Sequence, residues 1–68
     1  MESEPITNQL YEVSKRFGFF PTDSLITLKP RTKEATIKPI KGMSYSHRCA
    51  LLSVAIQNGW SLTINPNP

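Results

Sequence analysis

Basic side chains are concentrated in the middle of this chain. Six of its eight Lys and Arg residues lie between positions 29 and 48, and Glu34 is the only acidic residue in that interval. The six are Lys29, Arg31, Lys33, Lys38, Lys41 and Arg48. Because Lys and Arg bind phosphate oxygens, the segment 29–48 predicts a surface that binds nucleic acid or a complex that handles nucleic acid. The competing interpretation is a solvated sheet face, since exposed antiparallel faces are commonly rich in Lys.

A glycine-containing segment, KGMSYSHR over 41–48, leads into the most apolar stretch of the chain. If a helix begins there, its free backbone N–H groups would attract an anion, with Lys41 and Arg48 adding positive charge. The two-glycine spacing of a phosphate-binding P-loop is absent. Ser44 and Ser46 suit ordinary N-capping, which is the simpler interpretation of this segment.

His47 and Cys49 carry the most reactive side chains. Each is the only one of its type, so one chain can supply neither two imidazole ligands for a metal nor an internal disulfide. We expect His47 to be an inert surface residue at a helix start and Cys49 to be buried. The alternative is a toxin-like ribonuclease with His47 as general base beside neighbouring cations. Close carboxylate pairs are confined to the N-terminus, so the sequence predicts a non-enzymatic protein without a metal or cofactor.

The first element that must position these residues is a helix. Apolar residues at intervals of four, three and four predict a helix over 5–17. These residues are Ile6, Leu10, Val13 and Phe17. Gly18 can take the left-handed conformation that closes a helix, and Phe19 or Phe20 would then fold back onto the last turn.

Three strands are predicted, over 25–29, 35–38 and 60–64. Apolar and β-branched residues dominate these segments and alternate with polar ones. Pro30 and Pro39 end the first two strands, and the polar turn between them makes the pair a hairpin.

The order helix, strand, strand, helix, strand predicts an α+β single domain over 1–68, with residues 1–4 and 65–68 frayed. We expect the third strand to lie beside the first, giving spatial order 2-1-3 and a three-stranded antiparallel sheet with two helices on one face. The inward residues would be Ile26, Leu28, Ala35, Ile37, Trp60, Leu62 and Ile64. The outward residues would be Thr27, Lys29, Thr36, Lys38, Ser61 and Thr63. No aromatic residue faces outward, which favours phosphate contacts over base stacking.

The stretch from Tyr45 to Trp60 predicts a helix that is apolar around most of its circumference, since Ser53 is the only polar residue between Cys49 and Ile56. Such a helix needs cover on more than one side, and 68 residues offer little material for it. This favours either a homodimer or a protein-binding inhibitor or adaptor that blocks or recruits a larger protein. The anchors expected for that alternative are Phe19, Phe20, Leu51 and Val54. Otherwise the first helix and the neighbouring phenylalanines cover the central helix completely.

Localisation can be predicted from what the sequence lacks. No apolar run approaches the roughly 20 residues of a membrane span. The N-terminus has no basic region followed by an apolar one, as a signal peptide would. Together with the single cysteine, these features predict a cytoplasmic protein without membrane contact.

Overall fold

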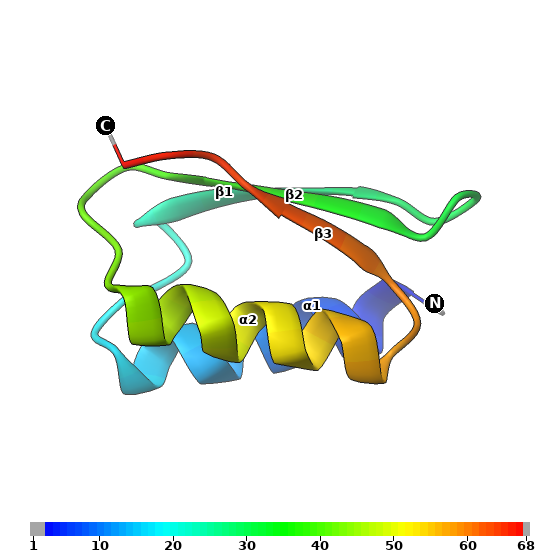
Figure 1. Cartoon of the computed structure of the whole chain (residues 1–68), viewed down its shortest axis with the longest axis horizontal. Helices are drawn as coiled ribbons and strands as arrows, with labels where there is room; N and C mark the ends of the chain where they lie inside the picture. The colour runs from blue at the N-terminus through cyan, green and yellow to red at the C-terminus, as the bar shows by residue number, and fades with distance from the viewer. Residues whose placement is uncertain (1–2, 68) are drawn as a thin grey trace.

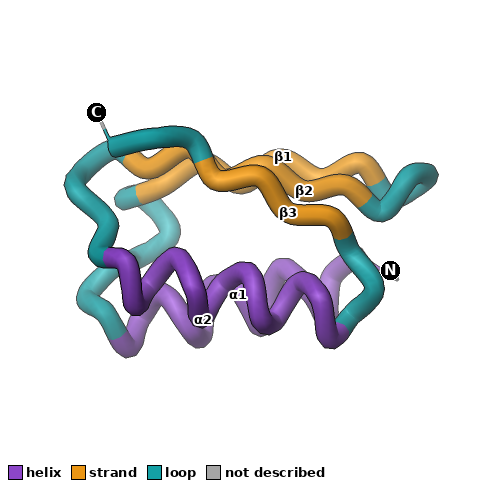
Figure 2. Tube along the Cα trace, in the orientation of Figure 1, coloured by secondary structure: helices purple, strands orange, loops and turns teal. Residues whose placement is uncertain are grey.

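The fold is a layer of two helices packed on one face of a three-stranded sheet (Figures 1 and 2). The computed structural model describes the backbone of residues 3–67 and the side chains of residues 6–67. The elements in chain order are α1 (Ser3–Arg16), β1 (Ser24–Lys29), β2 (Glu34–Pro39), α2 (Tyr45–Gln57) and β3 (Ser61–Ile64). The α+β class, the order α-β-β-α-β and the placement of both helices on one face are confirmed. No helix within the described residues is long and apolar enough to cross a membrane.

The strand order differs from the one predicted. The sheet has the order β1-β2-β3, with β2 antiparallel to β1 and parallel to β3. The prediction that the third strand lies beside the first, in a fully antiparallel sheet, was wrong. The reason is the connection: α2 runs back along the sheet after β2, so β3 starts again at the same end and pairs parallel with β2 as a βαβ unit.

The predicted division of the sheet into two faces is confirmed. All seven residues expected to point inward are buried or partly buried, and all six expected to point outward are exposed. Ala35 and Ile37 of the central strand β2 are almost fully buried, at 2% and 1% exposure. The inward face therefore meets the helices, and the outward face meets solvent.

Both helices end in the same closing motif. Gly18 and Gly59 have positive φ angles of 80° and 74°. The aromatic residue after each glycine, Phe19 or Trp60, donates its backbone N–H over 2.9 Å to a carbonyl in the last turn. Both aromatic side chains then turn into the core, as is typical of a Schellman closure. The expected fold-back of Phe19 or Phe20 is thus made by Phe19.

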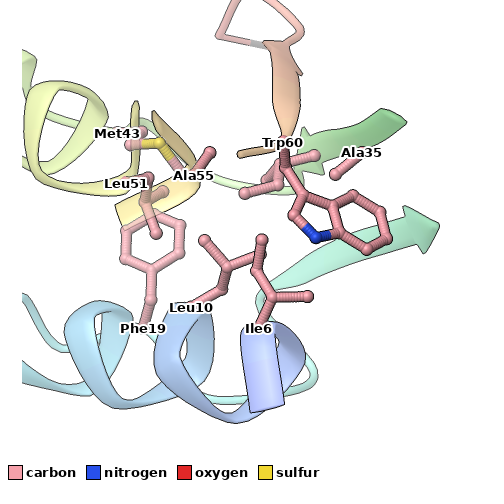
Figure 3. Close-up of a cluster of buried hydrophobic side chains, with 9 residues drawn as sticks. Ile6, Leu10, Phe19, Ala35, Met43, Leu51, Ala55 and Trp60 are labelled. Carbon is pink, nitrogen blue, oxygen red and sulfur yellow. The ribbon is translucent and has the colours of Figure 1, made fainter. Parts of the chain in front are cut away.

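The core lies between the sheet and the two helices (Figure 3). Its buried side chains are Ile6, Leu10, Phe19, Ala35, Ile37, Met43, Leu51, Ala55 and Trp60. Figure 3 shows Ile6 and Leu10 rising from α1 toward Trp60, while Phe19 lies below Leu51. Nine buried apolar side chains among residues 6–67 make a small core, so the loss of any one of them would remove a large share of it.

Candidate nucleic-acid interface

The hairpin turn between β1 and β2 carries three of the six predicted cations. Lys29, Arg31 and Lys33 are all exposed. The Lys33 N–H donates to the Pro30 carbonyl over 3.3 Å, which closes the four-residue turn. The Ser61 N–H donates to the Lys33 carbonyl over 2.8 Å, so the turn is also fastened to the start of β3. The anchored turn lies at one end of the sheet (Figure 1); Arg31 and Lys33 belong to it, and Lys29 is the last residue of β1 beside it.

Lys33 has an unusual backbone conformation. Its φ angle of 54° lies in the left-handed region, where glycine is favoured. A residue with a Cβ atom costs about 1–2 kcal/mol there. The turn itself therefore does not explain why lysine occupies this position. Backbone strain of this kind concentrates at functional sites, which directs attention to the Lys33 side chain.

The fourth cation, Lys38, lies on the outward face of β2. It is directly opposite Leu25 of β1, and Lys29 is opposite Glu34. Position 38 is four residues beyond position 34 on β2, so Lys29 and Lys38 lie about 13 Å apart along this face. Between these rows, Thr27, Thr36 and Thr63 are aligned across the three strands and offer hydroxyl groups.

Four of the predicted cations thus form one exposed surface. We call Lys29, Arg31, Lys33 and Lys38 the basic surface. Within residues 6–67, none of the four forms an ion pair, and Glu34 forms none either. A hollow of about 360 Å³ lined by Lys29, Pro30, Arg31 and Thr32 opens on the turn. The accessible lining of this hollow is apolar, so the phosphate contacts proposed for this surface depend on the charged ends of the side chains around it.

Lys41 is not part of the basic surface. Its Nζ donates to the Gly18 carbonyl over 3.2 Å and lies 3.5 Å from Asp23 Oδ2. It also lies 4.8 Å from the centre of the Phe19 ring, in cation–π contact. Asp23 accepts the Phe20 N–H over 2.8 Å, and this bond and Lys41 hold the pKa of the Asp23 carboxyl below its usual value. Lys41 therefore braces the loop between α1 and β1.

Arg48 is also engaged within the chain. Its guanidinium donates to the Asn65 carbonyl over 3.1 Å and to Asn67 Oδ1 over 2.7 Å. The same Asn67 oxygen accepts the Met43 N–H over 2.8 Å. We call Arg48, Asn65 and Asn67 the C-terminal clasp. Residues 65 and 67 are therefore hydrogen-bonded, where the sequence predicted a frayed tail over 65–68. Pro68 lies outside the described residues, as do residues 1 and 2 of the expected N-terminal tail.

The start of α2 is satisfied by its own neighbours. Ser44 is the N-cap, and its hydroxyl accepts the His47 N–H over 3.1 Å. The Met43 N–H is taken by Asn67, and Arg48 is held in the clasp. These contacts confirm the capping interpretation for Ser44 and leave the anion-binding interpretation of 41–48 without a free cation at the helix start.

His47 is buried, so the prediction of an inert surface residue was wrong about its location. Its side chain has 0% exposure. The ring stacks on Phe17 with centroids 4.7 Å apart and meets Phe19 edge-on at the same distance. Its Nε2 lies 2.9 Å from the Ser14 hydroxyl, while Nδ1 has no hydrogen-bond partner among the described residues. A substrate cannot reach this imidazole in the folded chain.

The surroundings of His47 favour the neutral imidazole. Burial lowers its pKa from the usual value, and the nearby Arg48 charge lowers the pKa further. The burial of His47 could not be predicted from the sequence, because its position at a helix start gave no indication that Phe17 and Phe19 would enclose the ring. Within the described residues, no cluster of three His, Cys, Asp or Glu side chains is arranged to hold a metal ion.

The anchors expected for a protein partner are mostly unavailable. Phe19 and Leu51 are buried, at 4% and 0% exposure, so their expected exposure was wrong. Val54 is partly buried, and Phe20 is exposed. Cys49, which we expected to be buried, is exposed as well.

An exposed apolar row on α2 was missed. It consists of Tyr45, Cys49, Leu52 and Ile56, and we call it the outer stripe. The signal was present in the sequence as spacings of four, three and four, the same spacing that identified α1. It was hidden because nearly every position of this segment is apolar, so spacing alone could not separate the buried face from the exposed one.

Comparisons of the chain with protein-family models, with curated proteins and with solved structures found no significant match. The assignment of a function therefore depends on the chemistry of the exposed side chains.

Proposed function

We propose that this protein is a small non-enzymatic module that binds nucleic acid, or a complex that handles nucleic acid, through the basic surface. The main support for this proposal is that the four cations of the basic surface are exposed and unpaired within residues 6–67. Lys29, Arg31, Lys33 and Lys38 are exposed and form no ion pair within residues 6–67, whereas Lys41 and Arg48 are bound to other groups of the chain. Unpaired Lys and Arg on one surface are the groups that contact backbone phosphates.

The chemistry of this surface suits the phosphate backbone better than the bases. It carries cations and the aligned hydroxyls of Thr27, Thr36 and Thr63, with no aromatic ring for stacking. Four phosphate contacts would make the affinity fall about 50- to 150-fold between about 50 and 200 mM salt. A cytoplasmic location, which gives access to RNA and DNA, belongs to the same proposal.

The inhibitor or adaptor remains the alternative to this proposal. Two of its four expected anchors, Phe19 and Leu51, lie in the core. Phe20 keeps 58% exposure and stands as its best remaining anchor. A partner held by Phe20 would be insensitive to salt, which separates the two functions experimentally.

The test is a titration of the purified protein with mixed DNA and RNA fragments at about 50 and 200 mM salt, a range over which a phosphate interface weakens strongly. We expect Arg31→Gln combined with Lys33→Gln to reduce binding. The matched control, Lys15→Gln with Arg16→Gln, removes two exposed charges from the last turn of α1 and should bind like the unmodified chain. Equal losses in both double variants would reduce the effect to net charge and contradict a localised site.

A further inference from the structure

The outer stripe on α2 has no cover in the described structure. Tyr45 is 81% exposed, Leu52 38% and Ile56 74%, and Cys49 is also exposed. At 3.6 residues per turn these four positions fall within about 60° of the helix circumference. They therefore form one straight apolar seam along the whole length of α2.

The seam is also free of charge. The exposed residues beside it, Ser46, Ser53 and Gln57, are small or neutral. The only formally charged residue of α2, Arg48, turns its guanidinium into the C-terminal clasp. The outer face of α1 is different, because it presents Glu12, Lys15 and Arg16 to solvent. Single exposed apolar residues are ordinary, but an uncharged row of four on one helix is typical of an interface.

We infer that the outer stripe is a homodimer interface in which the α2 helices of two copies pack antiparallel about a two-fold axis. An axis midway along the stripe places Tyr45 against Ile56 of the second copy and Cys49 against Leu52 of the second copy. Large side chains then meet at both ends, and a small one meets a larger one at the centre. Ser46 and Ser53 beside the seam allow the helix axes to approach to about 8–10 Å.

For two copies of this chain, charge favours antiparallel over parallel packing of the α2 helices. Each chain carries a formal charge of +3, so two copies associate best when their cations stay apart. The hairpin turn lies at the end of the sheet where α2 finishes, since Ser61 is bonded to Lys33 (Figure 1). Antiparallel helices therefore place the two hairpin turns, with Arg31 and Lys33, at opposite ends of the dimer, whereas parallel helices would bring them together. The neutral seam offers no charge by which a different, charged partner would be selected.

The size of the outer stripe sets the expected affinity of the dimer. The 13 residues of α2 span about 20 Å. A single helix pair of this length buries less than the roughly 800 Å² per partner of a standard interface. The dimer should therefore be reversible, with a dissociation constant on the order of 10–100 μM. This inference does not depend on nucleic-acid binding, because the stripe and the basic surface are on different faces of the molecule.

Sedimentation equilibrium of the full chain, from about 1 μM to about 1 mM, brackets such a dimer. The mass of the unmodified chain should rise from one copy toward two. Ile56→Asp should remain a monomer across the range, because it places a carboxylate in the seam of each copy. Gln57→Asp is the matched control: it adds the same charge one residue away, outside the stripe, and should dimerise like the unmodified chain. Both positions are exposed, so circular dichroism should show an unchanged fold.

The single cysteine offers an independent readout. In the antiparallel pair the two Cys49 side chains lie about 10 Å apart, within reach of a short bifunctional maleimide. We expect a crosslinked dimer from the unmodified chain and from Gln57→Asp, but not from Ile56→Asp. An unmodified chain that stays monomeric up to about 1 mM would overturn the inference, even if the stripe then captured a different protein. A dimer that persists in Ile56→Asp would place the interface elsewhere and overturn it equally.

Discussion

The hairpin end of the sheet and the opposite end, where α2 begins, both carry basic side chains, but these are held in different ways. At the hairpin, Arg31 and Lys33 project from an anchored turn and form no ion pair within residues 6–67. At the other end, Lys41 and Arg48 hold a loop and the C-terminal residues in place, and among the described residues Lys38 alone is exposed and unpaired on the outward face of β2. A single basic segment of the sequence therefore combines cations available to a ligand with cations that stabilise the fold.

The largest expected effect is on binding at the hairpin end. Replacing Lys29, Arg31 and Lys33 together by Gln should weaken nucleic-acid binding about 100-fold at low salt and flatten the dependence of log K on log salt by about 0.9 for each lost contact. The free energy of unfolding should change by less than about 0.5 kcal/mol, since these side chains are exposed. Fluorescence anisotropy and urea denaturation measure the two quantities. An unchanged affinity would end the nucleic-acid proposal.

The next largest effect is on stability, at the contact between α1 and the first turn of α2. Ser14→Ala leaves the buried His47 ring without its hydrogen-bond partner and should lower the free energy of unfolding by about 1–3 kcal/mol. Ser53→Ala is the control, because Ser53 is exposed on α2 and its change should stay within about 0.5 kcal/mol. Urea denaturation at pH 8 compares the two variants. If Ser14→Ala proves as harmless as Ser53→Ala, the Ser14 contact contributes nothing to stability.

His47 should also make stability depend on pH. Its pKa in the fold is below the unfolded value of about 6.5, so the folded chain binds fewer protons and is favoured at higher pH. The contribution is fully present above about pH 6.5 and is lost as the pH falls from there toward the folded pKa. Urea midpoints measured from pH 8 to pH 5 should decrease, and His47→Gln should flatten the decrease. The Asp23 carboxyl, whose pKa is also lowered, acts in the separate window below about pH 4. A slope in the pH 5–8 window that survives His47→Gln would assign it to other groups.

Arg48 and Lys38 allow a direct comparison between a cation that is hydrogen-bonded within the chain and one that is unpaired on the outward sheet face. Arg48→Met removes two hydrogen bonds of the C-terminal clasp and should cost about 1–2 kcal/mol of stability, with little effect on nucleic-acid affinity. Lys38→Met should do the reverse, because Lys38 is exposed and unpaired within the described residues. Thermal denaturation and binding titrations of both variants complete the comparison. If Arg48→Met weakened nucleic-acid binding without loss of stability, Arg48 would have to be added to the nucleic-acid interface.

Much of the fold could be predicted because its signals are local. The spacing of Ile6 and Leu10, the closing glycines and the alternation along each strand depend on neighbours in the sequence. The strand order could not be predicted in the same way. The alternation of β3 is compatible with either neighbour, and only the path of α2 across the sheet decides between β1 and β2.

The candidate site was only partly predictable for the same reason. Exposure of the hairpin cations follows from a polar turn between two short strands. The engagement of Arg48 depends on Asn67, which lies 19 residues away, and that of Lys41 depends on Gly18, which lies 23 residues away. The burial of His47 requires Ser14 from the other helix. Contacts over such distances are properties of the folded chain and leave no periodic trace in the sequence.

The smallest expected effect tests whether strain at the hairpin is kept for binding. Lys33→Gly relieves the left-handed φ of 54° and should raise the free energy of unfolding by about 1 kcal/mol. It also removes one cation, so nucleic-acid affinity should fall several-fold. Lys33→Gln removes the same charge but keeps the strain, so it should lose affinity equally without gaining stability. Chemical denaturation and binding titrations of the pair separate the backbone from the side chain. If Lys33→Gly gains stability and keeps its affinity, lysine at this position serves neither the turn nor the ligand, and the contrast between the two ends would then depend on Lys29 and Arg31.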